Sequence, residues 1–199
     1  MSLSFCKRLA LAAGLLLSAS GAEAHPDISA PARLLFDFED GRLVRLVESL
    51  TFDEARSRIL LRDHDVNDDG VFSPEEQEDM ARQISADFGR HAFFLEMRSS
   101  GRLQVLGRPI AFTARNEGGA VTIAIAFAMG EPLVVAEDRP VEVMIRDRDY
   151  TVAFRYAEDR PALTRGEGDL TCDHKLVERP DDAYFGGLIV PQAIRLSCR

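Results

Sequence analysis

The stretch RLLFDFEDGRLVRLVESL, residues 33–50, decides the fold class. Apolar residues alternate from Arg33 to Phe38, and a second apolar segment runs from Leu43 to Leu50. Between them, Glu39-Asp40-Gly41 supplies a turn with a glycine that is free to adopt a positive φ. These features predict a β-hairpin.

After this hairpin the apolar period changes from two to about 3.6 residues. Thr51 and Glu54 have the spacing of a capping box, which predicts a helix start. The predicted apolar face of this helix consists of Phe52, Ala55, Ile59 and Leu60. A second helix is predicted from Pro74 to Gly89, with Met80, Ile84 and Phe88 facing the core. We therefore expect a helix-loop-helix insertion at residues 51–89.

The rest of the chain alternates short apolar segments with turn residues. The predicted strands are 92–98, 103–106, 110–115, 120–128, 141–146, 151–156 and 188–197. Residues 157–185 are expected to be loops with one short strand around Cys172. Together with the hairpin, this pattern predicts a mainly β, α+β protein: an antiparallel β-sandwich that carries the helical insertion.

Composition limits both the architecture and the partners. With 199 residues, 46% of them hydrophobic and 29% charged, the chain suits one globular domain. Its net charge of −9, without a Lys/Arg run, lacks the surface that neutralises phosphates. Nucleic acid is therefore excluded as a partner, whereas the oligomeric state is not predicted.

Residues 1–24 have the pattern of a secretory signal peptide. Lys7 and Arg8 precede an apolar run from Leu9 to Leu17, and Ala22-Glu23-Ala24 matches a signal-peptidase site. The apolar run is too short to span a bilayer, and no later segment is suitable. We expect a soluble exported protein without a lipid anchor, whose mature chain, residues 25–199, is a single β-rich domain.

Export also predicts a disulfide. Cleavage after Ala24 leaves Cys172 and Cys198 in an oxidising compartment, where thiols tend to pair. No CxxC spacing supports the alternative, a catalytic or metal-binding thiol.

The segment DVNDDGVFSPEE, residues 65–76, fits the EF-hand calcium loop. Its expected calcium ligands are Asp65, Asn67, Asp69, Val71 through its carbonyl, Ser73 and Glu76. Gly70 allows the sharp turn, whereas Phe72 and Gln77 depart from the usual pattern without removing a ligand. The alternative interpretation is a solvated acidic turn. With this loop, the predicted insertion is EF-hand-like, and a structural calcium site is favoured over a regulatory switch.

A second metal site is suggested at the expected mature N-terminus. The α-amine and imidazole of His25 can chelate zinc, nickel or copper, and Asp27 can add an oxygen. The sequence leaves open which of His64, His91 and His174 approaches His25. The alternative is a frayed terminus without a bound metal.

Several motifs resemble those of a known family. They are Ala24-His25-Pro26, Thr51-Phe52-Asp53-Glu54, the 65–76 loop, and Asp147 to Tyr150 leading into Val152-Ala153-Phe154. Together they resemble the DUF1007 family of bacterial periplasmic proteins. That resemblance implies a periplasmic component associated with NicO-type inner-membrane transporters of nickel, cobalt or zinc. The family's second N-terminal histidine is replaced here by Asp27, and the proline of its Asp-Pro-x-Tyr pattern by Arg148.

Two functions are favoured over a third, an enzyme with a copper centre on His25, which would need a second imidazole near His25. The first is a metal-binding accessory protein with calcium in the 65–76 loop, assisting a divalent-metal transporter. The alternative is a calcium-stabilised periplasmic adaptor without a transport role. The sequence contains no G-x-S-x-G motif of serine hydrolases, no H-E-x-x-H zinc motif, no Walker phosphate loop and no G-x-G-x-x-G dinucleotide motif. We therefore do not expect an enzyme.

Overall fold

The computed structural model describes residues 28–199. Its helices are α1 (Glu54–His64) and α2 (Pro74–Gly89), with short 3-10 turns at Ala92–Phe94 and Pro180–Asp182. Its strands are β1 (Ile28–Glu39), β2 (Arg42–Thr51), β3 (Leu95–Ser99), β4 (Arg102–Gln104), β5 (Leu106–Glu117), β6 (Ala120–Leu133), β7 (Val141–Ile145), β8 (Val152–Tyr156), β9 (Ala162–Arg165), β10 (Cys172–Glu178) and β11 (Gln192–Cys198). The protein is therefore mainly β, of the α+β class, as predicted.

The first hairpin forms as the sequence predicts. β1 and β2 pair antiparallel, and the turn residues Asp40 and Gly41 have φ of 49° and 70°. Positive φ at both central residues is the turn geometry that matches strand twist, and aspartate and glycine tolerate it. β1 begins at Ile28, well before the predicted Arg33.

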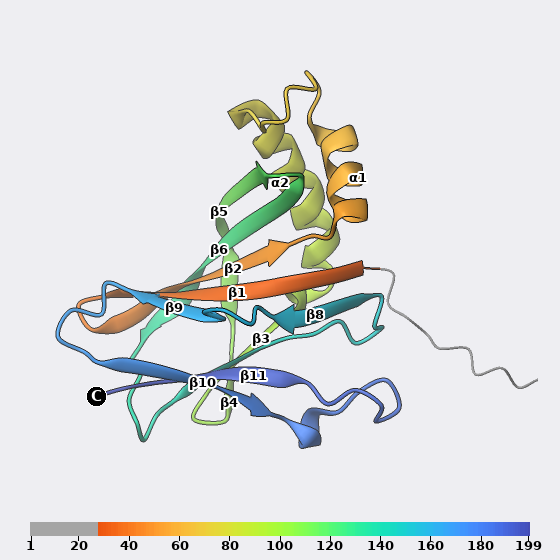
Figure 1. Ribbon diagram of the computed structural model, residues 1–199. Coiled ribbons are helices and arrows are strands. Elements are labelled where there is room, and N and C mark those ends of the chain that lie inside the picture. The colour runs from red at the N-terminus through yellow and green to blue at the C-terminus, as the bar shows by residue number, and fades with distance from the viewer. Residues whose placement is uncertain (1–27) are drawn as a thin grey trace, which may run out of the picture.

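The strands form two sheets (Figure 1). One has the order β5-β6-β2-β1-β8, with β9 also paired to β1. The other has the order β10-β11-β7-β3-β4. The prediction of purely antiparallel strands was wrong, because β1 pairs parallel with both β8 and β9. The long β1 allows this, since β8 and β9 bind successive parts of the same edge.

Side chains from both sheets meet in one hydrophobic core. Leu34, Phe36 and Ile123 of the six-stranded sheet belong to the same buried cluster as Val143 and Ile194 of the five-stranded sheet. The alternation within each strand explains this arrangement, because every second residue points inward.

The helical hairpin lies beside the six-stranded sheet, with α1 against β6 and α2 against β5 (Figure 1). The predicted Thr51–Glu54 capping box is wrong. Thr51 remains in β2, where its hydroxyl bonds that of Thr122 at 2.9 Å, and Asp53 caps α1 by accepting from the Arg56 amide. The side chain of Asp53, directly before the helix, thus replaces the expected cap at Thr51.

The two helices differ in how well their buried faces were predicted. Met80 and Ile84 of α2 are buried, and Phe88 packs against the core. In α1, Leu60 is buried as predicted, but Ala55 and Ile59 are exposed, and Ser57 and His64 are buried in their place. Ser57 is buried because its hydroxyl both donates to the Phe52 carbonyl and accepts from the Val121 amide.

The second half of the chain contains more regular structure than predicted. Residues 92–94, expected to begin a strand, form a 3-10 turn, and residues 157–185 contain the whole of both β9 and β10. The predicted short strand around Cys172 is β10, whereas β9 was not predicted; both strands carry polar and charged residues and lie at sheet edges. None of the helices within residues 28–199 is long and apolar enough to cross a membrane.

The predicted disulfide is present. Cys172 and Cys198 face each other across the β10–β11 ladder and form a bond with an S–S distance of 2.05 Å. Because the pair closes a loop of 26 positions, it stabilises the folded state by about 3 kcal/mol in the chain-entropy account.

Candidate metal sites at the two ends of α2

The acidic loop between the helices folds around Asp65. The buried carboxylate of Asp65 accepts the Asp69 amide at 3.2 Å and the Gly70 amide at 2.8 Å. Gly70 has a φ of 77°, a conformation that favours glycine and lets its N–H turn inward. The loop is thus wrapped around its first predicted ligand.

Glu76 closes the loop from the first turn of α2. Its two carboxylate oxygens accept the amides of Val66 at 2.7 Å and Ser73 at 2.8 Å, while the Ser73 hydroxyl accepts the Glu76 amide. This is a capping box at Ser73, in which the capping residues are also predicted calcium ligands. The amide from Ser73 lowers the pKa of Glu76 most, so this side chain is held as a carboxylate facing the loop.

The remaining predicted ligands complete a network of short local bonds. Asn67 accepts the Asp69 amide at 3.2 Å, and Asp69 accepts the Val71 amide at 2.8 Å. Within residues 28–199, the carboxylates of Asp65, Asp69 and Glu76 do not form a group whose ligand atoms all lie within 4.8 Å of one another. Like charges repel, and backbone amides hold these oxygens instead. The donor set itself, all oxygen, fits calcium.

The two departures from the EF-hand pattern anchor the loop to the sheet. Phe72 is only 4% exposed and joins the hydrophobic core. Gln77 donates to the Phe72 carbonyl at 2.9 Å and accepts the Ala114 amide of β5 at 3.0 Å. Asn116, also in β5, donates to the Gly70 carbonyl at 3.0 Å. These contacts fix the loop on the edge strand β5.

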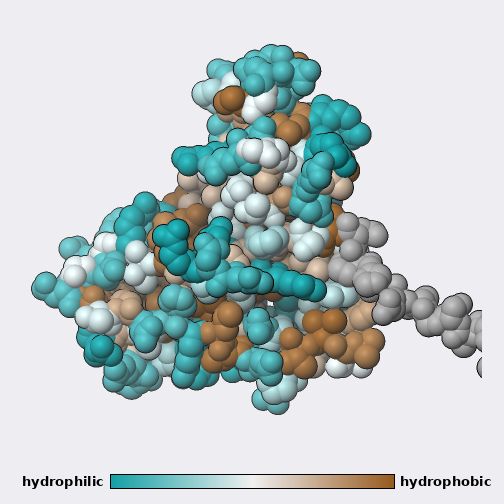
Figure 2. All heavy atoms as spheres, in the orientation of Figure 1, coloured by the Kyte–Doolittle hydropathy of each residue, from teal (hydrophilic) through white to brown (hydrophobic). Residues whose placement is uncertain are grey.

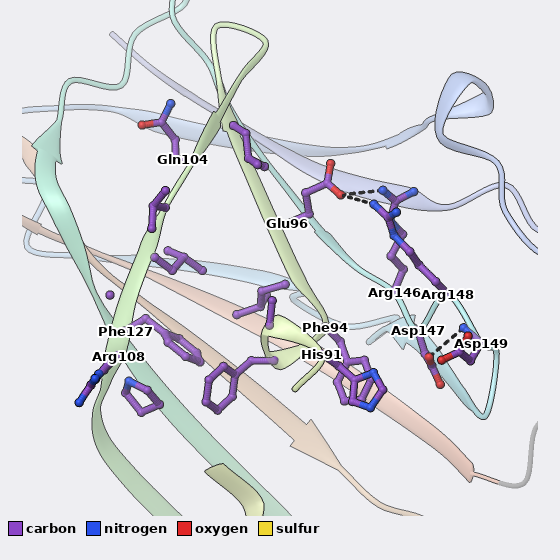
Figure 3. A pocket seen from close by; sticks show the side chains of 18 residues that line it. His91, Phe94, Glu96, Gln104, Arg108, Phe127, Arg146, Asp147, Arg148 and Asp149 are labelled. Atoms are coloured by element: carbon purple, nitrogen blue, oxygen red, sulfur yellow. Dashed lines mark hydrogen bonds and ion pairs between the residues drawn. The ribbon is translucent and has the colours of Figure 1, made fainter. Parts of the chain in front are cut away.

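A second group of ligand atoms lies beyond the other end of α2. One ligand atom from each of His91, Asp147 and Asp149 lies within 4.8 Å of the others. Figure 3 shows the His91 ring beside the carboxylates of Asp147 and Asp149. His91 and Asp149 are exposed, whereas Asp147 is only 2% exposed.

The backbone brings this group together. The amide of Arg146 donates to the Phe94 carbonyl at 2.9 Å, which joins the end of β7 to the turn after His91. Ala92, Phe93 and Phe94 have φ between 50° and 59°, a left-handed turn that is costly for such residues. The His91 ring stacks on Phe94 with ring centroids 5.2 Å apart and an interplanar angle of 11°.

Asp147 organises the other half of the group. Its Oδ1 accepts the Asp149 amide at 3.0 Å, and its Oδ2 accepts the amides of Thr151 and Val152 and the Thr151 hydroxyl. Burial raises the pKa of Asp147, but the bonds from Thr151, Val152 and Asp149 outweigh it and the pKa is lowered. Asp147 is thus a rigidly held carboxylate.

The group lies at the rim of a groove of about 750 Å³ (Figure 3). Its apolar wall includes Phe93, Leu106 and Phe127, and its polar rim includes Glu96 and Arg146. Glu96 pairs with Arg146 at 2.6 Å. Burial raises the pKa of Glu96, but its pairing with Arg146 and a neighbouring arginine lowers it overall.

The other predicted site residues have different outcomes. The signal peptide, His25 and Asp27 lie outside the described residues. His64 is buried beside the loop, and His174 lies in β10. Neither His64 nor His174 joins a group of three ligand side chains within residues 28–199, whereas His91 does. The sequence contained two signals for that group: a histidine just past a helix end, and closely spaced aspartates at a strand end.

The fold and its two ligand clusters define a mainly β protein with two sheets and an acidic helical hairpin. The chain belongs to the family described as "Protein of unknown function (DUF1007)", whose family model matches residues 10–185. The resemblance expected from the sequence is thereby confirmed. No curated protein matches the sequence.

Proposed function

We propose that this is a soluble, non-enzymatic periplasmic protein that binds calcium in its 65–76 loop and assists an inner-membrane transporter of zinc, nickel or cobalt. In this proposal the two sheets form a β-sandwich, and the helical hairpin is an EF-hand-like insertion. One observation carries the calcium site: Asp65 and Glu76, the first and last predicted ligands, both turn inward onto the loop that joins them.

The donor chemistry supports calcium. Calcium takes about six to eight oxygen ligands from carboxylates, carbonyls and water in flexible geometry. The predicted ligands of the loop are three carboxylates, an amide oxygen, a hydroxyl and a backbone carbonyl. It contains no nitrogen or sulfur ligand side chain, which a softer metal would favour.

The anchors on β5 favour a structural ion over a switch. A regulatory EF-hand opens by swinging its helices apart and exposing an apolar groove. Here Phe72 is buried, and Gln77 and Asn116 tie the hairpin to β5. Calcium would therefore neutralise the loop's carboxylates and clamp the hairpin against the sheet.

Thermal unfolding of matched variants tests the calcium site. Wild-type protein should melt at a higher temperature in calcium than in chelator, because ligand at about 100 times Kd adds about 2.7 kcal/mol. Asp65→Asn should remove this shift. Asp68→Asn, the same substitution at a loop position outside the predicted ligand set, should keep it. Identical melting of the wild type in calcium and chelator would contradict the proposal.

The transport role rests on the family resemblance, and the net charge of −9 suits a protein that handles cations. Its test is the metal content of cells that lack the gene. Zinc, nickel or cobalt content should change under metal limitation or excess. Unchanged content in both conditions would count against a role in transport.

Exposed apolar side chains favour the second candidate, a calcium-stabilised adaptor. Leu188 is 78% exposed, and Phe185 and Val190 nearby are also exposed. Figure 2 shows a mostly hydrophilic surface over the helical hairpin and larger apolar areas around the five-stranded sheet. Clustered exposed apolar groups often mark protein interaction sites. For an adaptor, Asp65→Asn should weaken capture of an envelope partner while cellular metal content stays constant.

A further inference from the structure

We propose that His91, Asp147 and Asp149 bind a divalent transition-metal ion such as zinc at the rim of the groove, and leave part of its coordination sphere open to an incoming ligand. One ligand atom from each side chain lies within 4.8 Å of the other two. A set of one imidazole and two carboxylates suits zinc and its neighbours better than calcium. The biological role of this site rests on the proposed function, which it deepens by locating the handled ion.

The spacing of the three ligand atoms is close to what such an ion requires. Zinc lies about 2.0–2.2 Å from its nitrogen and oxygen ligands, which places neighbouring ligand atoms about 3 to 4 Å apart. Within residues 28–199, no hydrogen bond joins the His91 ring to either aspartate, so these side chains face one another without being joined (Figure 3). Small rotations of the exposed His91 and Asp149 side chains would bring all three ligands onto one ion.

The charges around the group favour a cation. Arg146 and Arg148 flank Asp147 in the sequence, but both pair with Glu96, at 2.6 and 3.5 Å (Figure 3). Among the described residues, neither Asp147 nor Asp149 has an ion-pair partner. Two carboxylates therefore lie close together without a compensating positive charge, and a divalent cation between them would supply it.

The two aspartates are held by one turn before an ion arrives. The Asp149 amide donates to Oδ1 of Asp147 at 3.0 Å, and the Tyr150 amide donates to the Asp147 carbonyl at 3.1 Å. Oδ2 of Asp147 accepts the amides of Thr151 and Val152 at 2.8 and 3.0 Å. Oδ1 thus accepts a single hydrogen bond and keeps a lone pair for an ion. Hydrogen bonds of this kind orient metal-binding carboxylates.

The third ligand, His91, is held by a cluster of aromatic rings. Its ring stacks on Phe94 with centroids 5.2 Å apart. Phe94 in turn packs against Phe88 of α2 and Phe154 of β8, with centroid distances of 5.2 and 5.0 Å. Because stacking covers a face of the imidazole, the nitrogens at its edge stay available to bind an ion.

The exposure of the ligands suits an ion that is exchanged. All three side chains line the groove, with His91 and Asp149 exposed and Asp147 forming the buried base. A structural zinc site is closed by four protein ligands, whereas three protein ligands leave a position for water or an incoming ligand. An ion at this rim can therefore pass to a ligand of another molecule, as delivery to a transporter requires.

Calorimetric titration of the untagged protein with zinc chloride tests the site. Saturating calcium is present, so that the 65–76 loop does not take up zinc. Wild type should bind a zinc ion that His91→Gln does not retain. Loss of an outer hydrogen-bond partner alone costs 10- to 100-fold in metal affinity, so loss of the ligand itself should cost about 100-fold or more. With cobalt chloride, visible absorption that indicates nitrogen coordination should appear in the wild type only.

Matched controls separate ligand loss from other effects. His174→Gln removes a histidine of β10 outside the group and should leave the zinc Kd unchanged. Asp149→Asn should weaken binding, whereas Asp138→Asn, on the exposed loop before β7, should not. Asp147 is left unchanged, because it also holds its own turn together. Equal thermal unfolding of metal-free wild type and His91→Gln would show that the variant keeps its fold.

The binding data decide the site directly. Absence of zinc binding, or equal binding by wild type and His91→Gln, would overturn it. Unchanged binding by Asp149→Asn would overturn Asp149 as a ligand. Because Asp65→Asn should lose the calcium shift and retain zinc binding, failure of the calcium site and failure of this one are distinguishable.

The cellular role of the site is tested separately from the transport role itself. A strain that carries His91→Gln should reproduce the change in zinc, nickel or cobalt content expected when the gene is lost. A change on loss of the gene but none with His91→Gln would overturn the role of this site and leave the proposed function standing. No change in either strain would overturn the transport role, even where the purified protein binds zinc.

Discussion

The two ends of α2 hold ligand clusters of different origin. At the N-terminal end, twelve consecutive residues, 65–76, provide the predicted calcium ligands. At the other end, about 24 Å away along a 16-residue helix, His91 meets Asp147 and Asp149 from after β7. The first cluster is local in sequence, whereas the second exists only when β3 and β7 pair. Its integrity therefore depends on the whole fold.

The clusters also differ in how their oxygens are held. In the loop, backbone amides within the same segment hold Asp65 and Glu76. At the other end, Asp147 is held by its own turn, but its approach to His91 depends on the bond between Arg146 and Phe94. A change inside the loop should act mainly on calcium, and a change in β pairing mainly on the transition metal.

The largest expected effect comes from removing the loop's anchor. Phe72→Ala should destabilise the calcium-free protein by about 3–5 kcal/mol, because it removes a buried aromatic side chain and leaves a cavity. Calcium affinity should fall too, since the loop loses its position on β5. Chemical denaturation in chelator and calcium titration measure the two effects. Zinc binding at His91 should remain while the protein is folded.

Val71→Ala is the control for this change. Val71 is 65% exposed and contributes only its backbone carbonyl to the predicted calcium site, so its replacement should change neither stability nor calcium affinity appreciably. Equal stability of Phe72→Ala and Val71→Ala would show that the loop is not anchored through the core, and the contrast between the two ends would disappear.

The core that both ends share contains a buried carboxyl group. Glu48 in β2 is fully buried, and neither carboxylate oxygen has a hydrogen-bond partner in the structure. Burial raises the pKa of Glu48 well above its usual value. Folding therefore takes up a proton at pH values between the unfolded pKa and the raised folded pKa, and the contribution of this group to stability falls as pH rises through that window.

Glu48→Gln should remove this dependence. Relative to the variant, the wild type should lose up to about 1.4 kcal/mol of stability per pH unit within that window. Unfolding free energies measured at several pH values provide the test, with exposed Glu117→Gln as the control. Parallel pH profiles for wild type and Glu48→Gln would contradict it. Because Glu48 belongs to neither cluster, metal binding at both ends should persist, which separates ligand loss from a general change in stability.

Features that depend on local sequence could be predicted, whereas those that depend on distant strand pairing could not. The hairpin and the Cys172–Cys198 pair were predictable because each depends on local spacing or on a single possible pairing. The meeting of His91 with Asp147 was not, because it depends on the β3–β7 register over 50 residues. The α1 face was predicted only in part: Leu60 is buried as expected, but Ser57 is buried through two hydrogen bonds that a hydrophobic pattern does not reveal.

The smallest expected loss of stability comes from replacing Gln77, a residue that departs from the EF-hand pattern. In the structure it links the Phe72 carbonyl to the Ala114 amide of β5. Gln77→Leu restores an apolar residue but leaves both groups unpaired, which should cost about 1–2 kcal/mol. Gln83→Leu on the exposed side of the same helix loses only a bond to Asp79 and should cost less. If Gln77→Leu were instead neutral and calcium affinity unchanged, Phe72 alone would anchor the loop, and Gln77 would be an incidental substitution.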